Sequence, residues 1–143
     1  MLKNIDPLLG PELLAALRAM GHGDEIAIVD GNYPADNHAK RLIAYHGVNL
    51  IPILRAVLSI LPLDNDVSQP AIRTCNTTHP DTPDAIHKEI DKTLSSALEE
   101  HQIKVTHGPN FYDRVKSCYV VVPTSEQALF ANIILRKGAL GKT

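Results

Sequence analysis

The apolar positions of this 143-residue chain alternate between helical spacing and short continuous runs. Residues 11–20 predict a first helix, because Pro11 stands in its first turn and Gly21 follows its end. Its apolar stripe repeats at helical spacing and consists of Leu13, Leu14, Leu17 and Met20. Residues 25–29 form an apolar run that predicts a strand, and the turn-forming residues 31–37 predict a loop after it.

Two longer helices are predicted in the middle of the chain. The first covers residues 50–61, with Asn49 as its N-cap, and Pro62 ends it. The second begins with Thr82 as its N-cap and Pro83 as its first helical residue. Its apolar positions recur every four residues, at Ile86, Ile90, Leu94 and Leu98. We therefore expect the first helix to be buried on most sides and the second to pack through one face.

The remaining segments are short. Residues 41–46 predict a strand, with a helical turn over 36–42 as the alternative. Residues 124–127 have the form of a capping box and predict a short helix. The other predicted elements are strands at 71–75, 103–105, 119–122 and 132–135 and a short helix at 111–116. Because strands and helices alternate, we expect an α/β fold, a single domain over residues 1–143 in which helices cover a mixed β-sheet.

Composition narrows the classes of function. A net charge of −2 gives no basic field of the kind that binds phosphate backbones, so nucleic acid is not an expected partner. We expect no signal peptide, because residues 1–7 lack a long apolar stretch, and no membrane span, because no later apolar run approaches about eighteen residues. The chain is therefore predicted to be cytoplasmic. Cys75 and Cys118 lack metal-ligand spacing and are expected to be buried thiols.

The segment from Met20 to Ala35 contains the most informative polar residues. His22 stands between two glycines, and imidazole is the side chain that exchanges protons near neutral pH. Asp30 follows the predicted strand, where open α/β sheets commonly bind ligands. The alternatives are a half-exposed loop histidine that caps a helix end and an aspartate that forms an Asx turn. The residues by themselves leave both readings open.

The sequence gives little indication of a catalytic carboxylate pair, a metal site or a cofactor. Asp24 and Glu25 are adjacent, so in a strand they point to opposite faces and do not form a catalytic pair. The set His22, Asp24, Asp30 and His38 matches no known metal spacing, so no metal is expected. The chain lacks the glycine-rich motifs that bind nucleotides and the GxSxG motif of serine hydrolases. We therefore expect no cofactor.

Three further polar residues are candidates, each with a structural alternative. Asn132 begins the last predicted strand and either offers its amide to a pair of sugar hydroxyls or caps the backbone. Tyr112 either directs its phenol into a pocket or packs with its hydroxyl in water. Asp64 either forms a turn after the long apolar helix or acts as a pocket acid.

Taken in order, segments along nearly the whole chain resemble the ribose pyranase and L-fucose mutarotase family. The segments that carry the resemblance are Leu2-Lys3, Pro11 to Leu14, Met20 to Ile26, Asp30, Tyr33 to Ala35, Leu61 to Asp64, Phe111 to Arg114 and Asn132 to Gly138. The family resemblance implies a mixed α/β fold in ring-shaped homo-oligomers, decamers in known members, with the sugar site completed between subunits. It also implies a cofactor-free change of anomeric or ring form in a free monosaccharide.

The resemblance also assigns roles to residues. His22 matches the proton-donating histidine of the family, while Asp30, Asp64, Tyr112 and Asn132 match its sugar-binding positions. We expect Phe130 and Ala131, beside Asn132, to contact the sugar as well. Ring opening needs one proton given to the ring oxygen and one taken from the anomeric hydroxyl, so a positioned imidazole with carboxylate and phenol partners suffices.

Within the family the chain is closer to the fucose mutarotase branch, because Tyr112 stands where the ribose branch tends to have lysine. Two positions depart from both branches. Phe130 stands where a tyrosine is usual, and Gly108 stands where arginine or histidine is usual, with His107 beside it as a candidate replacement. The departures motivate an alternative, a non-catalytic sugar-binding or transport-associated protein. A third hypothesis is a small metal-dependent hydrolase that uses His22 with nearby acids.

Overall fold

The computed structural model describes residues 1–142, which form five helices and five strands. In chain order they are α1 (Pro11–Ala19), β1 (Glu25–Val29), α2 (Ala35–His38), α3 (Leu50–Leu58), β2 (Ala71–Thr74), α4 (Ala85–Leu98), β3 (Ile103–Thr106), α5 (Pro109–Lys116), β4 (Val120–Pro123) and β5 (Ile133–Arg136). The strands form one sheet in the order β3-β2-β5-β1-β4. Strand β5 is antiparallel to β1 and β2, whereas β1 is parallel to β4 and β2 to β3. The predicted α/β fold with a mixed sheet is confirmed.

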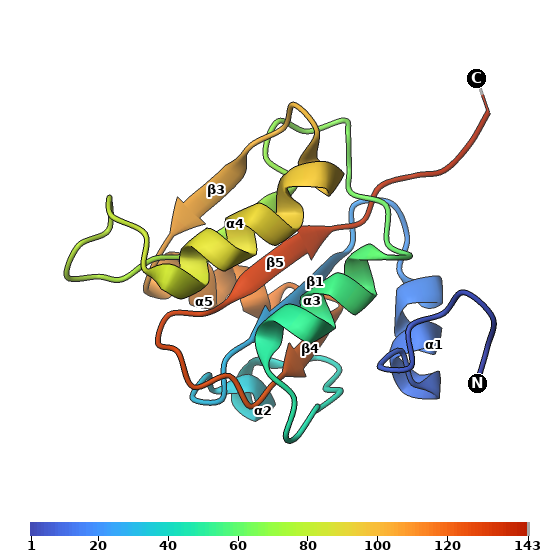
Figure 1. Ribbon diagram of the computed structural model, residues 1–143, viewed down its shortest axis with the longest axis horizontal. Helices are drawn as coiled ribbons and strands as arrows, with labels where there is room; N and C mark the ends of the chain where they lie inside the picture. Colours follow the sequence, from blue (N-terminus) through green and yellow to red (C-terminus); the bar gives the residue numbers. More distant parts are fainter. Residues whose placement is uncertain (143) are drawn as a thin grey trace.

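Helices cover both faces of this sheet. Figure 1 shows α3 and α4 across the near face, with α5 behind the sheet. Strand β1 is buried along its whole length, and its side chains alternate between two hydrophobic cores, one on each face of the sheet. Ile26 and Ile28 pack in the larger core with α1, α3 and α4. Ala27 and Val29 face the other way, toward the smaller core around α2 and α5. Each large apolar side chain so buried contributes roughly 1.5–3 kcal/mol, which makes β1 the center of the fold.

Two predicted elements differ in the structure. The 41–46 segment runs beside β4 as predicted for a strand, with an isolated bridge at Leu42 and backbone hydrogen bonds of Arg41, Ile43 and Tyr45, but it forms no continuous strand. The short helix α2 replaces part of the predicted loop before it. Residues 124–127 take a non-helical path. There the Thr124 hydroxyl donates to the carbonyl of Val29 at 2.8 Å, and the Glu126 carboxylate accepts the N–H of Leu50 at 3.3 Å.

Asn49 is the N-cap of α3, as predicted, but its side chain makes no capping hydrogen bond, and the Glu126 carboxylate accepts the N–H of Leu50. Two other helix boundaries differ from the predictions. The N-cap of α4 is Asp84, two residues after the predicted Thr82. Helix α3 ends at Leu58, three residues before the predicted end.

The expectation for the two cysteines is confirmed. Cys75 and Cys118 are buried and unbridged among the described residues, and burial raises the pKa of the Cys118 thiol to about 12. Within residues 1–142, no helix has the length and apolar character needed to cross a membrane.

A close backbone contact joins the end of β5 to the segment before β2. The N–H of Gly138 donates to the carbonyl of Pro62 at 2.8 Å, and the N–H of Asp64 donates to the carbonyl of Arg136 at 3.1 Å. A Cβ on Gly138 would overlap the carbonyl of Leu63. The position therefore requires glycine for close approach.

We predict that Gly138→Ala lowers the free energy of unfolding by about 2 kcal/mol or more, since the added methyl group has to displace backbone. Urea unfolding followed by circular dichroism measures the change. The matched control is Gly141→Ala, because a Cβ there meets none of the described residues within 4 Å. Equal stability of the two variants would contradict the prediction.

Candidate functional site

Polar side chains surround a cavity of about 340 Å³ at the C-terminal ends of the parallel strands. Strands β1, β2 and β3 end at this side of the sheet and the antiparallel β5 begins there, so residues far apart in sequence meet. The volume lies in the range of small-molecule sites. The cavity is lined by Asp30, Asn32, Tyr33, Thr74, Cys75, Thr77, His107, Gly108, Phe111, Tyr112, Leu129, Phe130 and Asn132.

Asp30 and Asn132 are linked to each other at the cavity. The N–H of Asp30 donates to Oδ1 of Asn132 at 2.9 Å. The Asp30 carboxylate accepts the N–H of Asn32 at 3.0 Å, which forms the Asx turn, and the N–H of Ala131 at 3.3 Å. Burial raises the pKa of Asp30 above its ordinary value and outweighs these hydrogen bonds, which act to lower it. The predicted turn former is therefore also a cavity residue.

Phe130 brings the chain into the cavity with an unusual backbone. Its φ of 58° lies in the left-handed region, which is uncommon for a residue other than glycine. The Thr74 hydroxyl donates to the carbonyl of Phe130 at 2.5 Å, and the hydroxyl oxygen of Thr74 accepts the N–H of Asn132 at 3.2 Å. The ring of Phe130 lines the cavity, whereas Ala131 is fully buried behind it.

Aromatic side chains from α2, α5 and the loop after β1 form another wall. The ring of Tyr33 meets Tyr112 edge to face with centroids 5.4 Å apart, and its hydroxyl lies 2.9 Å from Nδ1 of His38. Burial raises the pKa of Tyr33 above its ordinary value. Tyr112 is 43% exposed at the cavity mouth. Its phenol is thus accessible, as a binding residue requires.

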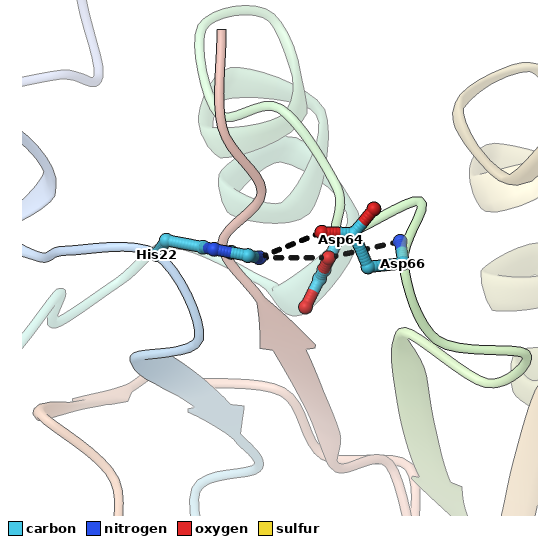
Figure 2. A group of neighbouring side chains, drawn as sticks. All are labelled: His22, Asp64 and Asp66. Carbon is cyan, nitrogen blue, oxygen red and sulfur yellow. Dashed lines mark hydrogen bonds and ion pairs between the residues drawn. The ribbon is translucent and has the colours of Figure 1, made fainter.

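His22 lies in a separate cluster at the other ends of the strands, where β1 begins and β5 ends. Figure 2 shows the imidazole pointing at Asp64 and Asp66, which come from the segment before β2. Its Nε2 is 3.1 Å from Oδ1 of Asp64 and 3.5 Å from Oδ2 of Asp66. The His22 side chain is 46% exposed, while that of Asp64 is 1% exposed. A buried carboxylate therefore orients an accessible imidazole.

Arg136 at the end of β5 holds the other side of Asp64, with Nε 2.6 Å from Oδ2. Burial acts to raise the pKa of Asp64, but hydrogen bonds from Arg136, His22 and the N–H of Asp66 outweigh it and lower the pKa to about 2. The carboxylate is consequently charged at neutral pH. His22, Asp64 and Asp66 also place ligand atoms within 4.8 Å of one another, as a metal site would need. A divalent cation there would have to share Asp64 with the guanidinium.

The two clusters are separated by the length of β1. A strand rises about 3.3 Å per residue, so five residues put roughly 16 Å between His22 and Asp30. Of the residues expected to bind sugar, Asp30, Tyr112, Phe130 and Asn132 meet at the cavity, and Ala131 supports it. Asp64 instead joins His22. His107 and Gly108 both line the cavity, so a histidine does stand at this wall.

Several cavity residues were not foreseen. Thr74 and Cys75 follow the same rule as Asp30, because they lie at the end of a strand parallel to β1, and this rule could have found them. Tyr33 lies in the segment from Met20 to Ala35 and lines the cavity, although the sequence predicted no role for it. Arg136, the partner of Asp64, lies in the Asn132 to Gly138 segment that carries the family resemblance, but no role was predicted for it.

Comparisons with known proteins agree with this architecture. The chain is 40% identical to a fucose mutarotase of Mus musculus, over 97% of this chain and 95% of that one. It is 36% identical to an L-fucose mutarotase of Glaesserella parasuis, over 96% and 95% of the two chains. A crystal structure of the fucose mutarotase from Streptococcus pneumoniae in complex with L-fucose superposes with a TM-score of 0.88 at 36% identity, covering 98% of this chain and 100% of that one.

The resemblance found in the sequence is therefore confirmed over nearly the full length. The profile of a family described as the RbsD / FucU transport protein family matches residues 3–140. The chain belongs to the RbsD / FucU transport protein family.

Proposed function

We propose that this protein is a mutarotase, an isomerase that interconverts the anomers or ring forms of a free monosaccharide, L-fucose or a related sugar, without a cofactor. The observation that supports this most is the near full-length relationship to proteins named fucose mutarotase, combined with His22 held by a buried carboxylate. The cavity is large enough for a small ligand and has both polar and aromatic walls.

The reaction requires two proton transfers at neighboring sugar oxygens. An acid gives a proton to the ring oxygen while a base takes one from the anomeric hydroxyl, and the ring then closes on the other face. His22 is suited to the acid role, because imidazole exchanges protons near neutral pH. Asp30 has its pKa raised by burial, which moves a carboxyl group toward the range where it can exchange a proton. Asn132 and Tyr112 supply polar groups that fix the sugar.

His22 and the cavity can act on one sugar only if two copies of the chain meet. We propose that the surface around His22 of one copy lies against the mouth of the cavity of the next copy. This head-to-tail contact is the kind that closes into a ring, and the decameric ring implied by the family remains our expectation for the assembly. The cytoplasmic location also stays a prediction.

A sugar-binding protein without efficient catalysis is the second candidate. The observation that favors it is the position of Phe130 and Gly108, which both line the cavity where other members usually carry polar side chains. His107 lines the same wall and offers an imidazole close to the missing group. Sugar binding measured by calorimetry without faster anomer exchange would identify this function.

The first test is removal of the imidazole. We predict that His22→Ala slows L-fucose anomer exchange by about 100-fold or more, because general acid catalysis contributes roughly 10²–10⁴-fold. Exchange NMR on a panel of free sugars measures the rate. His46→Ala is the control, since His46 is exposed and lies outside both clusters. Equal rates for His22→Ala and wild type with every sugar would rule out the proposal.

The second test asks whether the site is shared. We predict that His22→Ala and a cavity variant carrying Tyr112→Ala and His107→Ala are each inactive alone. Co-refolded in equal amounts, they should regain activity at about a quarter of the sites, because random head-to-tail pairing restores both halves there. Exchange NMR on the mixture provides the measurement. A mixture as inactive as its parents, despite mixed oligomers in native mass spectrometry, contradicts a site between copies.

The third test concerns Asp64. Its pKa falls from about 3.8 to about 2 on folding, so the ionized carboxylate stabilizes the fold above pH 4, and this stabilization is lost as the pH falls toward 2. We predict that Asp64→Asn is less stable than wild type at pH 7 and that the difference shrinks between pH 4 and pH 2. Urea unfolding at each pH measures it. A difference independent of pH would show that the charge of Asp64 is not the cause.

A further inference from the structure

We propose that His87 is a positioning residue of the sugar cavity, an inference that rests on the proposed function. His87 lies in the first turn of α4 and is fully buried, outside every segment that pointed to the site. Its side chain holds the carbonyl of Phe130, and through that peptide group it fixes Asp30 and the segment from Phe130 to Asn132.

The hydrogen bonds of His87 determine where its proton sits. The backbone N–H of Asp84 lies 3.1 Å from Nδ1, and because a backbone N–H can only donate, Nδ1 accepts. Nε2 therefore carries the hydrogen and donates to the carbonyl of Phe130 at 2.9 Å. One ring thus joins the N-cap of α4 to the cavity wall.

The carbonyl of Phe130 belongs to the same planar peptide unit as the N–H of Ala131. His87 and Thr74 both donate to the carbonyl, at 2.9 Å and 2.5 Å. The N–H at the other side of the plane donates to Oδ2 of Asp30 at 3.3 Å. Rotation of this plane would therefore break contacts on both sides at once. The plane is held from the helix side by His87 and from the cavity side by Asp30.

The backbone of Phe130 explains why such support is needed. A φ of 58° is disfavored for a residue with a Cβ and persists where the surroundings impose it. The residues after it include Asn132, whose Oδ1 accepts the N–H of Asp30 at 2.9 Å. A relaxed Phe130 would shift its own ring, Asn132 and Asp30 together, and all three line the cavity.

Two substitutions separate this role from simple capping of the helix. In His87→Gln, the amide nitrogen takes the place of Nε2 and keeps a donor for Phe130. In His87→Asn, the shorter amide takes the place of Nδ1, so it can accept the N–H of Asp84 but does not reach Phe130. The control is His101→Asn at the other end of α4, where the ring nitrogens lie 3.1 Å and 3.2 Å from the carbonyls of Leu98 and Asn65.

We predict that His87→Asn weakens L-fucose binding about tenfold, the effect of losing roughly one hydrogen bond, whereas His87→Gln stays within about threefold of wild type. Calorimetry on the assembled protein measures the dissociation constant. Hydrogen exchange in the sugar-free protein, read by mass spectrometry on peptides covering Phe130 to Asn132, should be faster in His87→Asn than in His87→Gln. His101→Asn should change neither quantity.

Equal losses in the Gln and Asn variants would overturn the proposal, because the ring would then matter only for packing. Wild-type exchange in His87→Asn would overturn it as well. The proposed function fails separately, if wild-type protein binds or interconverts no sugar. In that case hydrogen exchange at Phe130 to Asn132 still decides the role of His87.

Discussion

The antiparallel pairing of β1 with β5 is the constraint on which both clusters depend. Strand β1 is buried on both faces, and its register pairs Ile28 with Ile133 and Glu25 with Arg136. At one end this register brings Asp30 to Asn132, and at the other it brings the segment before β1 to Arg136. A shift by one residue would reverse every side chain of β5 and separate both pairs. The same pairing therefore builds the cavity and places His22 far from it.

The two buried carboxylates of these clusters are stabilized differently. Asp64 lies against the guanidinium of Arg136 and keeps its charge, so it can orient the His22 imidazole at neutral pH. Asp30 is held by backbone N–H groups, and burial raises its pKa. One carboxylate is thus suited to positioning and the other to exchanging a proton. The proposed reaction needs one acid and one base, and we assign these roles to His22, oriented by Asp64, and to Asp30.

Sequence patterns predicted the elements whose stability comes from periodic burial. Helix α1 lies close to where its helical apolar spacing placed it, and strand β1 lies where a continuous apolar run predicted it, because their apolar residues pack in the cores of the fold. The prediction failed at residues 124–127, where the side chains of Thr124 and Glu126 hydrogen-bond to Val29 and Leu50. It held only in part at residues 41–46, which lie beside β4 but share a single bridge with it. Local sequence propensity cannot predict hydrogen bonds to residues that are distant in the sequence.

The residues predicted for the site lie in two clusters, and the sequence did not indicate that separation. The family resemblance supplied His22, Asp30, Tyr112 and Asn132, but closeness of His22 and Asp30 in sequence hid the length of the strand between them. His87 could not have been found, since its role depends on a carbonyl 43 residues away.

If one sugar lies between two copies of the chain, a crystal structure of the assembled protein with L-fucose bound should show it directly. We expect a sugar that contacts Asp30 and Asn132 of one copy and His22 of a neighboring copy. A sugar enclosed by residues of a single copy, with every His22 remote from it, would rule out a site shared between copies.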